Sequence, residues 1–138
     1  MSSGPADCPL CATRDMPAIW CDARVRVVSA ADADYPGFLR VIWHAHVREM
    51  TDLELAEREH CLRVVLAVEQ ALRETLHPEK INLASFGNQV PHVHWHVIPR
   101  FADDAHFPDP VWAPRRRVAI ARPFDVAQFR AQLTRGLK

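Results

Sequence analysis

The sequence predicts an α+β fold in which a five-stranded antiparallel sheet packs with one long helix and one short C-terminal helix. Short apolar segments separated by turn residues recur through the first hundred residues. One long amphipathic pattern spans residues 51–76, and a shorter one begins after Asp125. The connections between the apolar segments are short enough for antiparallel pairing, so the sequence favours a single sheet with segregated helices.

The strands are recognised by β-branched and apolar residues bounded by loops. A turn at Asp22-Ala23 separates the first two, and a loop ending in Pro36-Gly37 precedes the third. The fourth and fifth flank the turn Gly87-Asn88-Gln89. The expected strands are 19–21, 25–29, 38–43, 80–86 and 90–98.

The long helix is predicted to run from Thr51 to Leu76. Thr51 and Glu54 have the spacing of a capping box, and Pro78 follows the end of the pattern. One face is apolar at a spacing of 3.6 residues, and the opposite face is polar. The apolar stripe consists of Cys61, Val65, Val68, Leu72 and Leu76.

The second helix is predicted to follow Asp125, which with Gln128 suits another capping box. Phe124 and Phe129 are spaced as a hydrophobic staple, and Gly136 could cap the far end. Residues 101–122, rich in proline, and the first dozen residues are expected to be irregular.

Length and composition limit the possible functions. The 138 residues, 49% of them hydrophobic, fit one domain over 1–138, with a core at about 8–101 and an extension over 102–138. Basic and acidic residues number 17 each, which gives no global argument for nucleic acid or an anionic membrane as partner. Neither a membrane-spanning run nor a signal pattern is evident, so we expect a cytoplasmic protein with reduced or metal-bound cysteines.

Three histidines alternate within one apolar run. His92, His94 and His96 recur at every second position of the last predicted strand, which places them on one face of the sheet. Three readings are open: a half-exposed strand without chemistry, a metal centre ligated by all three imidazoles, or nucleophilic catalysis by one imidazole that its neighbours orient and assist. The third suits attack at phosphorus, because a neutral nitrogen avoids the repulsion that an oxyanion meets.

Cysteines near the N-terminus suggest a separate metal site. Cys8 and Cys11 have the spacing of half a zinc site, and no second cysteine pair is present to complete it. The remaining ligands would have to be histidines. The alternative is two free thiols.

The run His92-Val93-His94-Trp95-His96-Val97-Ile98 resembles the signature of the histidine triad (HIT) family, in which three histidines alternate with apolar residues. The resemblance covers about residues 8–101. The segments 41–46 and 81–85, together with the cysteine pair, are similar to those of the short bacterial branch of this family.

The resemblance implies a nucleotidyl hydrolase or transferase that acts at the α-phosphorus of a nucleoside phosphoramidate or a dinucleoside polyphosphate. His94 would be the nucleophile and carry the nucleotidyl group transiently, His96 would contact phosphate oxygen, and His92 would orient His94 or bind metal. The family is typically homodimeric, with a purine nucleotide as substrate. No cofactor is needed for this chemistry.

The resemblance also implies how a structural zinc site would be completed. The ligand set would be Cys8, Cys11, His46 and His92, one zinc per chain, with His44 as a rival for His46. Zinc would then tie the N-terminal segment to the histidine strand.

Two features depart from the family pattern. The turn before the triad often carries a hydroxyl residue, whereas here it is Gly87-Asn88-Gln89. Asn88 and Gln89 offer N–H donors to substrate oxygen but no hydroxyl, which leaves a binding or sensor module with little turnover as an alternative. Asn82 is the nearest match, by a one-residue shift, to a substrate-binding asparagine.

Trp112 could fold over the site or cover a partner subunit.

Overall fold

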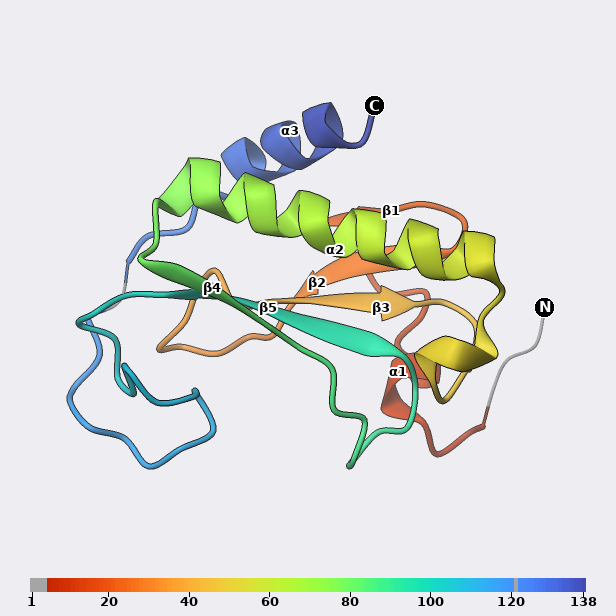
Figure 1. Cartoon of the computed structure of the whole chain (residues 1–138), viewed down its shortest axis with the longest axis horizontal. Coiled ribbons are helices and arrows are strands. Elements are labelled where there is room, and N and C mark those ends of the chain that lie inside the picture. The colour runs from red at the N-terminus through yellow and green to blue at the C-terminus, as the bar shows by residue number, and fades with distance from the viewer. Residues whose placement is uncertain (1–4, 121) are drawn as a thin grey trace.

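The computed structural model describes residues 5–120 and 122–138; residues 1–4 and 121, which belong to the segments expected to be irregular, lie outside the described residues. Its sheet has the strand order β1-β2-β3-β5-β4, and every neighbouring pair is antiparallel (Figure 1). The strands are β1 Trp20–Cys21, β2 Val25–Ser29, β3 Leu39–Trp43, β4 Lys80–Ala84 and β5 His94–Arg100. The predicted α+β fold with a five-stranded antiparallel sheet is confirmed.

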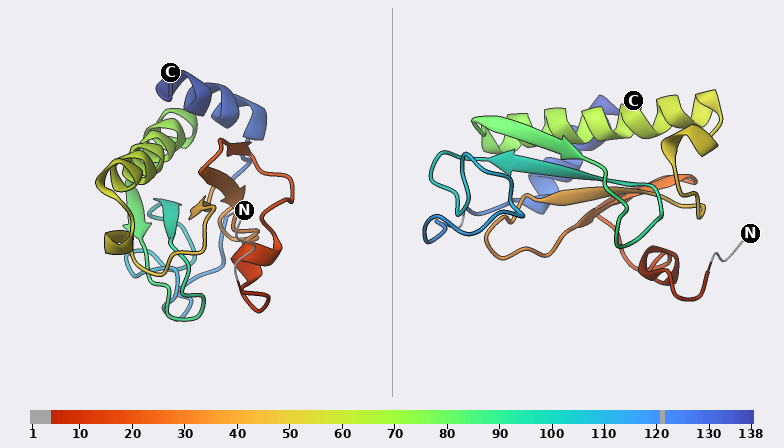
Figure 2. Two further views of the ribbon diagram at one scale, coloured as in Figure 1. Left: turned by 90° about the vertical axis from the view of Figure 1, so that its right-hand side faces the viewer. Right: turned by 60° about the horizontal axis from the view of Figure 1, so that its bottom comes forward.

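Helices cover one face of the sheet. The helix α2, Leu55–Leu76, lies along the sheet, and α3, Val126–Gly136, packs against α2 (Figures 1 and 2). The apolar stripe of α2 is buried as predicted, with Cys61, Val65 and Val68 at most 1% exposed. Among the described residues, none of the helices has the length and apolar character needed to cross a membrane.

The start of the long helix differs from the prediction. Residues Met50–Asp52 form a separate 3-10 turn, η1, and α2 begins at Leu55. The expected box between Thr51 and Glu54 is replaced by one between Glu54 and Glu57, whose side chains bond each other's backbone N–H. An extended Leu53, buried against the core, separates the two elements, so burial of one leucine outweighs the Thr51 capping signal.

Both ends of the chain also show differences. The N-terminal segment contains a short helix, α1 Pro9–Ala12, where coil was expected. At the other end, the Asp125 side chain accepts a hydrogen bond from the Gln128 backbone N–H, which is one of the two bonds of the predicted capping box. The Phe124 and Phe129 rings lie 5.5 Å apart, as the predicted staple requires. Gly136, however, is the last residue of α3 rather than its cap, a position that Leu137 takes.

Alternation along the central strands separates the core from the histidines. Leu39, Val41 and Val97 face α2 and are fully buried. Because side chains alternate along a strand, Arg40 and the β5 histidines point to the opposite face. The loops that follow β4 and β5 gather on that side (Figure 1). One face of the sheet therefore forms the hydrophobic core with α2. The other face, covered by loops, carries the histidines and can hold a functional site.

Candidate active site and metal cluster

The histidine run divides between strand and loop. Strand β5 begins at His94 rather than at Val90, so His92 precedes the strand, and its amide bonds the Val90 carbonyl. The ring of His92 is 1% exposed, and its Nε2 donates to the Trp43 carbonyl at 2.6 Å. A carbonyl can only accept, so Nδ1 is the basic nitrogen of the neutral ring.

That nitrogen faces the cysteine pair. The potential ligand atoms of Cys8, Cys11, His46 and His92 all lie within 4.8 Å of one another. Within the described parts of the chain, this is the group of His, Cys, Asp and Glu side chains that could hold a metal, and it takes only His92 from the triad. His44 is not in the group, because its Nδ1 lies 3.2 Å from the Ala23 carbonyl oxygen.

The separations within the cluster fit tetrahedral zinc. Zinc bonds of about 2.0 Å to nitrogen and about 2.3 Å to sulfur place neighbouring ligand atoms roughly 3.3–3.8 Å apart. The His92 Nδ1 lies 3.6 Å from the Cys8 sulfur and 3.5 Å from the Cys11 sulfur, and the His46 Nδ1 lies 3.3 Å from the Cys11 sulfur. Only the 3.1 Å between the two Nδ1 atoms is slightly short. The donor set and its spacing therefore fit the ion that the resemblance implied.

The cysteine-bearing helix α1 is fixed to the sheet by Arg26. This guanidinium, 2% exposed on β2, donates to the Leu10 carbonyl at 2.7 Å and lies 3.4 Å from the Thr13 hydroxyl. Burial, followed by the neighbouring Cys8, raises the pKa of the Cys11 thiol. A metal at this cluster would therefore displace a thiol proton on binding.

The next histidine has the opposite tautomer. His94 Nδ1 lies 2.6 Å from the His92 carbonyl oxygen, so Nδ1 carries the proton and Nε2 holds the lone pair. The Ser85 hydroxyl donates to the His94 carbonyl at 2.7 Å and holds this end of β5 against the segment that follows β4. The main chain thus fixes the His94 ring with the free lone pair on Nε2.

A cavity of about 470 Å³ adjoins His94. It lies on the face of the sheet opposite α2, between α1 and the loops that follow β4 and β5. Its lining contains a single formally charged side chain and no carboxylate. The lining residues are Pro9, Leu10, Arg40, Phe86, Gly87, Asn88, Gln89, Val90, His94, His96 and Trp112.

His96 is a neutral imidazole in an aromatic setting. Its ring lies 5.1 Å from that of His94 and contacts Phe38 and Trp112 edge-on at 5.6 and 5.3 Å. Burial, then His94 and Arg40, lowers the pKa of His96 to about 4. At neutral pH the ring therefore offers one N–H and one lone pair, rather than a fixed positive charge.

The turn before the histidines contributes both of its amide side chains to the lining. Gly87 has φ +73°, a conformation that glycine adopts without strain, and its turn sets Asn88 and Gln89 at the cavity. Both amide side chains are exposed at the rim, where they can meet a ligand. The Ser85 hydroxyl is already engaged with the His94 carbonyl.

Asn82 is not among the lining residues. It lies on the same sheet face, paired with Ile98, and its Oδ1 accepts from Arg100 at 2.8 Å. Arg100 in turn pairs with Asp104 through two nitrogens, at 2.8 and 3.0 Å. Asn82 therefore supports the base of the following loop, and any contact with a ligand would require rearrangement of this network.

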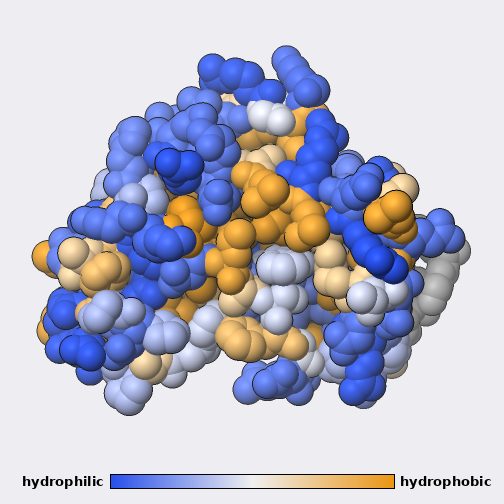
Figure 3. All heavy atoms as spheres, viewed as in Figure 1, coloured by the Kyte–Doolittle hydropathy of each residue, from blue (hydrophilic) through white to orange (hydrophobic). Residues whose placement is uncertain are grey.

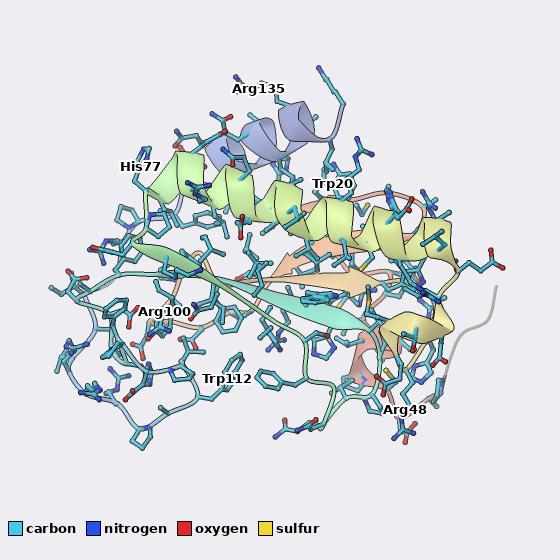
Figure 4. All side chains as sticks on the ribbon, viewed as in Figure 1. Trp20, Arg48, His77, Arg100, Trp112 and Arg135 are labelled. Carbon is cyan, nitrogen blue, oxygen red and sulfur yellow. The ribbon has the colours of Figure 1, made fainter. Side chains whose placement is uncertain are left out.

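That loop carries Trp112 and is held by one carboxylate. Besides Arg100, Asp104 accepts from the Tyr35 hydroxyl and from the amides of Phe101, His106 and Phe107. Burial would raise the pKa of this carboxyl, but the bonds from Arg100 and from the three backbone amides keep it well below its usual range. The loop brings Trp112 beneath the sheet, opposite α2 (Figure 4), where its ring lies 4.8 Å from Phe86. Trp112 folds over the cavity of its own chain, one of the two expected placements.

Sequence reasoning did not place five of the lining residues at the cavity: Arg40, Pro9, Leu10, Phe86 and Val90. Arg40 lies between Leu39 and Val41 on β3, whose side chains face the core, so the period of the strand could have placed Arg40 on the histidine face. Pro9 and Leu10 lie between the two cysteines, and they reach the cavity because the cysteine cluster holds α1 there. No local pattern in the sequence predicts that Pro9 and Leu10 lie at the cavity.

Comparison with known proteins identifies the class. A family model described as the HIT domain matches residues 14–103, and the chain therefore belongs to the HIT domain family. The chain is similar to a histidine triad protein from Bradyrhizobium japonicum, with 29% identity and a TM-score of 0.70 over 88% of this chain and 90% of that one.

Two further crystal structures are similar. A histidine triad protein from Marinobacter aquaeolei VT8 shares 25% identity and a TM-score of 0.68 over 88% of each chain. A zinc-bound histidine triad family protein from Mycobacterium smegmatis shares 25% identity and a TM-score of 0.65 over 94% of each chain. A search among curated proteins finds no match.

Proposed function

We propose that the chain binds a purine nucleotide in the cavity and cleaves a phosphoramidate or phosphoanhydride bond at its α-phosphorus. The observation that carries this proposal is the 2.6 Å hydrogen bond from His94 Nδ1 to the His92 carbonyl, which leaves Nε2 as a nucleophile at the cavity. Dinucleoside polyphosphates and nucleoside phosphoramidates are the candidate substrates.

The reaction has two displacements at phosphorus. The Nε2 lone pair forms an N–P bond, the bond to the leaving amine or phosphate breaks, and the leaving group takes a proton from solvent. Water then attacks phosphorus, the N–P bond breaks, and the attacking water returns one proton to solvent, which releases a nucleoside monophosphate and restores neutral His94. His96 and the side-chain amides of Asn88 and Gln89 would contact phosphate oxygens through N–H groups. His92 would contribute its carbonyl to His94 and its ring to the metal cluster.

The covalent intermediate gives the sharpest test. The protein is incubated with an adenosine phosphoramidate or diadenosine tetraphosphate, quenched in cold acid-free denaturant, digested, and analysed for a nucleotidyl adduct. We expect the adduct on the peptide that contains His94, and none in His94→Ala. As a matched control, His77→Asn changes an exposed histidine at the far end of α2 (Figure 4) and should keep the adduct and the turnover. Unchanged turnover in His94→Ala would contradict the proposal.

A binding or sensor module with little turnover is the second candidate. The turn Gly87-Asn88-Gln89 carries no hydroxyl, and the nearby Ser85 hydroxyl is bonded to the His94 carbonyl. A leaving group would then receive less assistance. Nucleotide binding without product over several hours, at enzyme concentrations equal to substrate, would favour this candidate over the enzyme.

We further propose that Cys8, Cys11, His46 and His92 hold one structural zinc. The zinc would join α1 to the segment before β5 and supply no step of the reaction. Metal analysis of purified protein should give one zinc per chain, lost in Cys8→Ser. The matched control is Cys21→Ser, because Cys21 is exposed and outside the cluster. Wild-type protein that takes up no zinc when it is supplied would exclude the site.

The proposed assembly is a homodimer formed through the β4 edge. Strand β4 ends the sheet, with Leu83 exposed on it, and Leu62 and Leu66 are exposed on α2. Apolar surface occupies the middle of the face on which α2 and β4 are seen (Figure 3). We expect Leu66→Glu to shift the particle from dimer to monomer mass in light scattering, whereas Leu55→Glu, at the start of α2, should not. A wild-type monomer at high concentration would contradict this assembly.

A further inference from the structure

Three arginines project from the cavity face of the sheet, one from each of three strands. Arg26 lies on β2, Arg40 on β3 and Arg100 on β5, and each guanidinium is at least partly withdrawn from solvent. A withdrawn guanidinium carries a desolvation penalty that is offset only by hydrogen bonds or an opposite charge. The partners of each arginine therefore indicate its purpose.

Two of the three are used within the protein. Arg100 is paired with Asp104, and it also bonds the oxygens of Asn82 and Asp109. Arg26 donates to the Leu10 carbonyl and fixes α1. Both side chains are 2–3% exposed, so each is a structural link.

Arg40 is different. Among the described residues its guanidinium forms no ion pair or hydrogen bond, and its Nε is buried without a partner. It pairs across the strands with His96 and lines the cavity with His94 and His96. It is the only formally charged side chain in that lining. A fixed cation beside a nucleophile, in a cavity without carboxylates, is complementary to an anion.

We propose that Arg40 binds a phosphate group of the substrate. The planar guanidinium presents paired N–H donors that match two oxygens of one phosphate, which no neutral histidine or amide can do. This inference rests on the proposed function and adds a specificity residue to it. The phosphate is either the one that His94 attacks or the next one along a polyphosphate chain, and both sources supply the same tetrahedral oxyanion.

Binding measurements separate a charge contact from a structural role. Calorimetric titrations compare adenosine, AMP and ADP on the wild type and on Arg40→Gln. Loss of a charge-assisted contact should weaken binding of the affected nucleotide about 10–100-fold. Adenosine, which has no phosphate, should bind within about 2-fold of wild type, because only electrostatic and hydrogen-bonded contacts to phosphate are removed. A comparable loss for adenosine would overturn the proposal.

The nucleotides also identify the phosphate. Weaker binding of both AMP and ADP assigns Arg40 to the α-phosphate, and weaker binding of ADP alone assigns it to the next phosphate. Unchanged binding of both overturns the proposal. Wild-type protein that binds none of the three ligands contradicts the proposed function as well, which distinguishes the two failures.

Two further variants control for charge and folding. Arg115→Gln removes the same charge from a half-exposed arginine that pairs with Asp34, outside the cavity, and should leave AMP and ADP binding unchanged. Arg40→Met keeps the length and apolar packing of the side chain, and it replaces Arg40→Gln if that variant unfolds. Arg40→Lys retains the charge without the planar donor pair, so it should recover part of the lost affinity.

Discussion

His92 and His94 are two residues apart, and the main chain gives them opposite tautomers. The Trp43 carbonyl accepts a hydrogen bond from the Nε2–H of His92, and the His92 carbonyl accepts one from the Nδ1–H of His94. The unprotonated nitrogen of His92 is therefore Nδ1, which faces the cysteines. The unprotonated nitrogen of His94 is Nε2, which remains available to the cavity. This difference shows that identical residues at alternate positions acquire separate chemistries from the carbonyls they meet, without any change of side chain.

The largest expected effect separates these two roles. Removal of the proposed nucleophile in His94→Ala should lower kcat by about 10³-fold or more while zinc content stays at the wild-type level. His46→Ala should do the reverse, losing zinc and retaining most of kcat at a temperature where it remains folded. Steady-state kinetics and metal analysis on both variants check this pair. Equal loss of kcat in the two would mean that the metal cluster takes part in the reaction.

Metal removal should change stability next most strongly. The proposed zinc would link α1 to the segment before β5, so its extraction by a chelator should lower the free energy of unfolding by roughly 3–5 kcal/mol, because binding energy at such a site is folding energy. Urea unfolding with and without added zinc measures the difference. Cys21→Ser should show the wild-type response, and Cys8→Ser should show no response to zinc.

Acid should destabilise the protein partly through His96. Its pKa is about 4 in the folded chain against an ordinary 6.5, so the unfolded chain binds more protons between these values and stability falls as pH falls through that window. The His96 share is about 2 kcal/mol at pH 5. Urea unfolding at pH 7.5 and 5.0 should show a loss in wild type that is smaller by this amount in His96→Asn. His77→Asn should keep the full loss.

The smallest effect concerns the wall of the cavity. Trp112→Ala removes an aromatic contact with Phe86 and His96, so KM for an adenine nucleotide should rise about 3–10-fold, with kcat little changed. The melting temperature should stay within about 2 °C of wild type, because the half-exposed ring is not part of the core. The control is Val118→Ala, which changes an exposed residue beyond the cavity. If this variant raised KM equally, the effect of Trp112→Ala would not arise from contact with the ligand.

Periodicity explains what the sequence could predict. The stripe from Cys61 to Leu76 identified the helix, and the alternation of histidines with apolar residues over 92–98 identified the two faces of that strand and the family, because each is a local pattern with a fixed spacing. The gathering of Cys8 with His92 came from resemblance, and the distances agree with it. What escaped prediction depends on contacts between distant segments, such as Arg40 lacking the partner that Arg100 has in Asp104.

The attachment of the Trp112 loop has a consequence for how this protein could change. Asp104 and Arg100 fix the loop from within, and Arg117 adds bonds to the Asp104 and Phe107 carbonyls. None of these bonds involves the Trp112 side chain. Position 112 should therefore tolerate substitution. Replacing its side chain alters which groups fit at the mouth of the cavity, while the hydrogen bonds that hold the loop stay intact. Substitutions at this single position should therefore change which ligands the proposed site prefers.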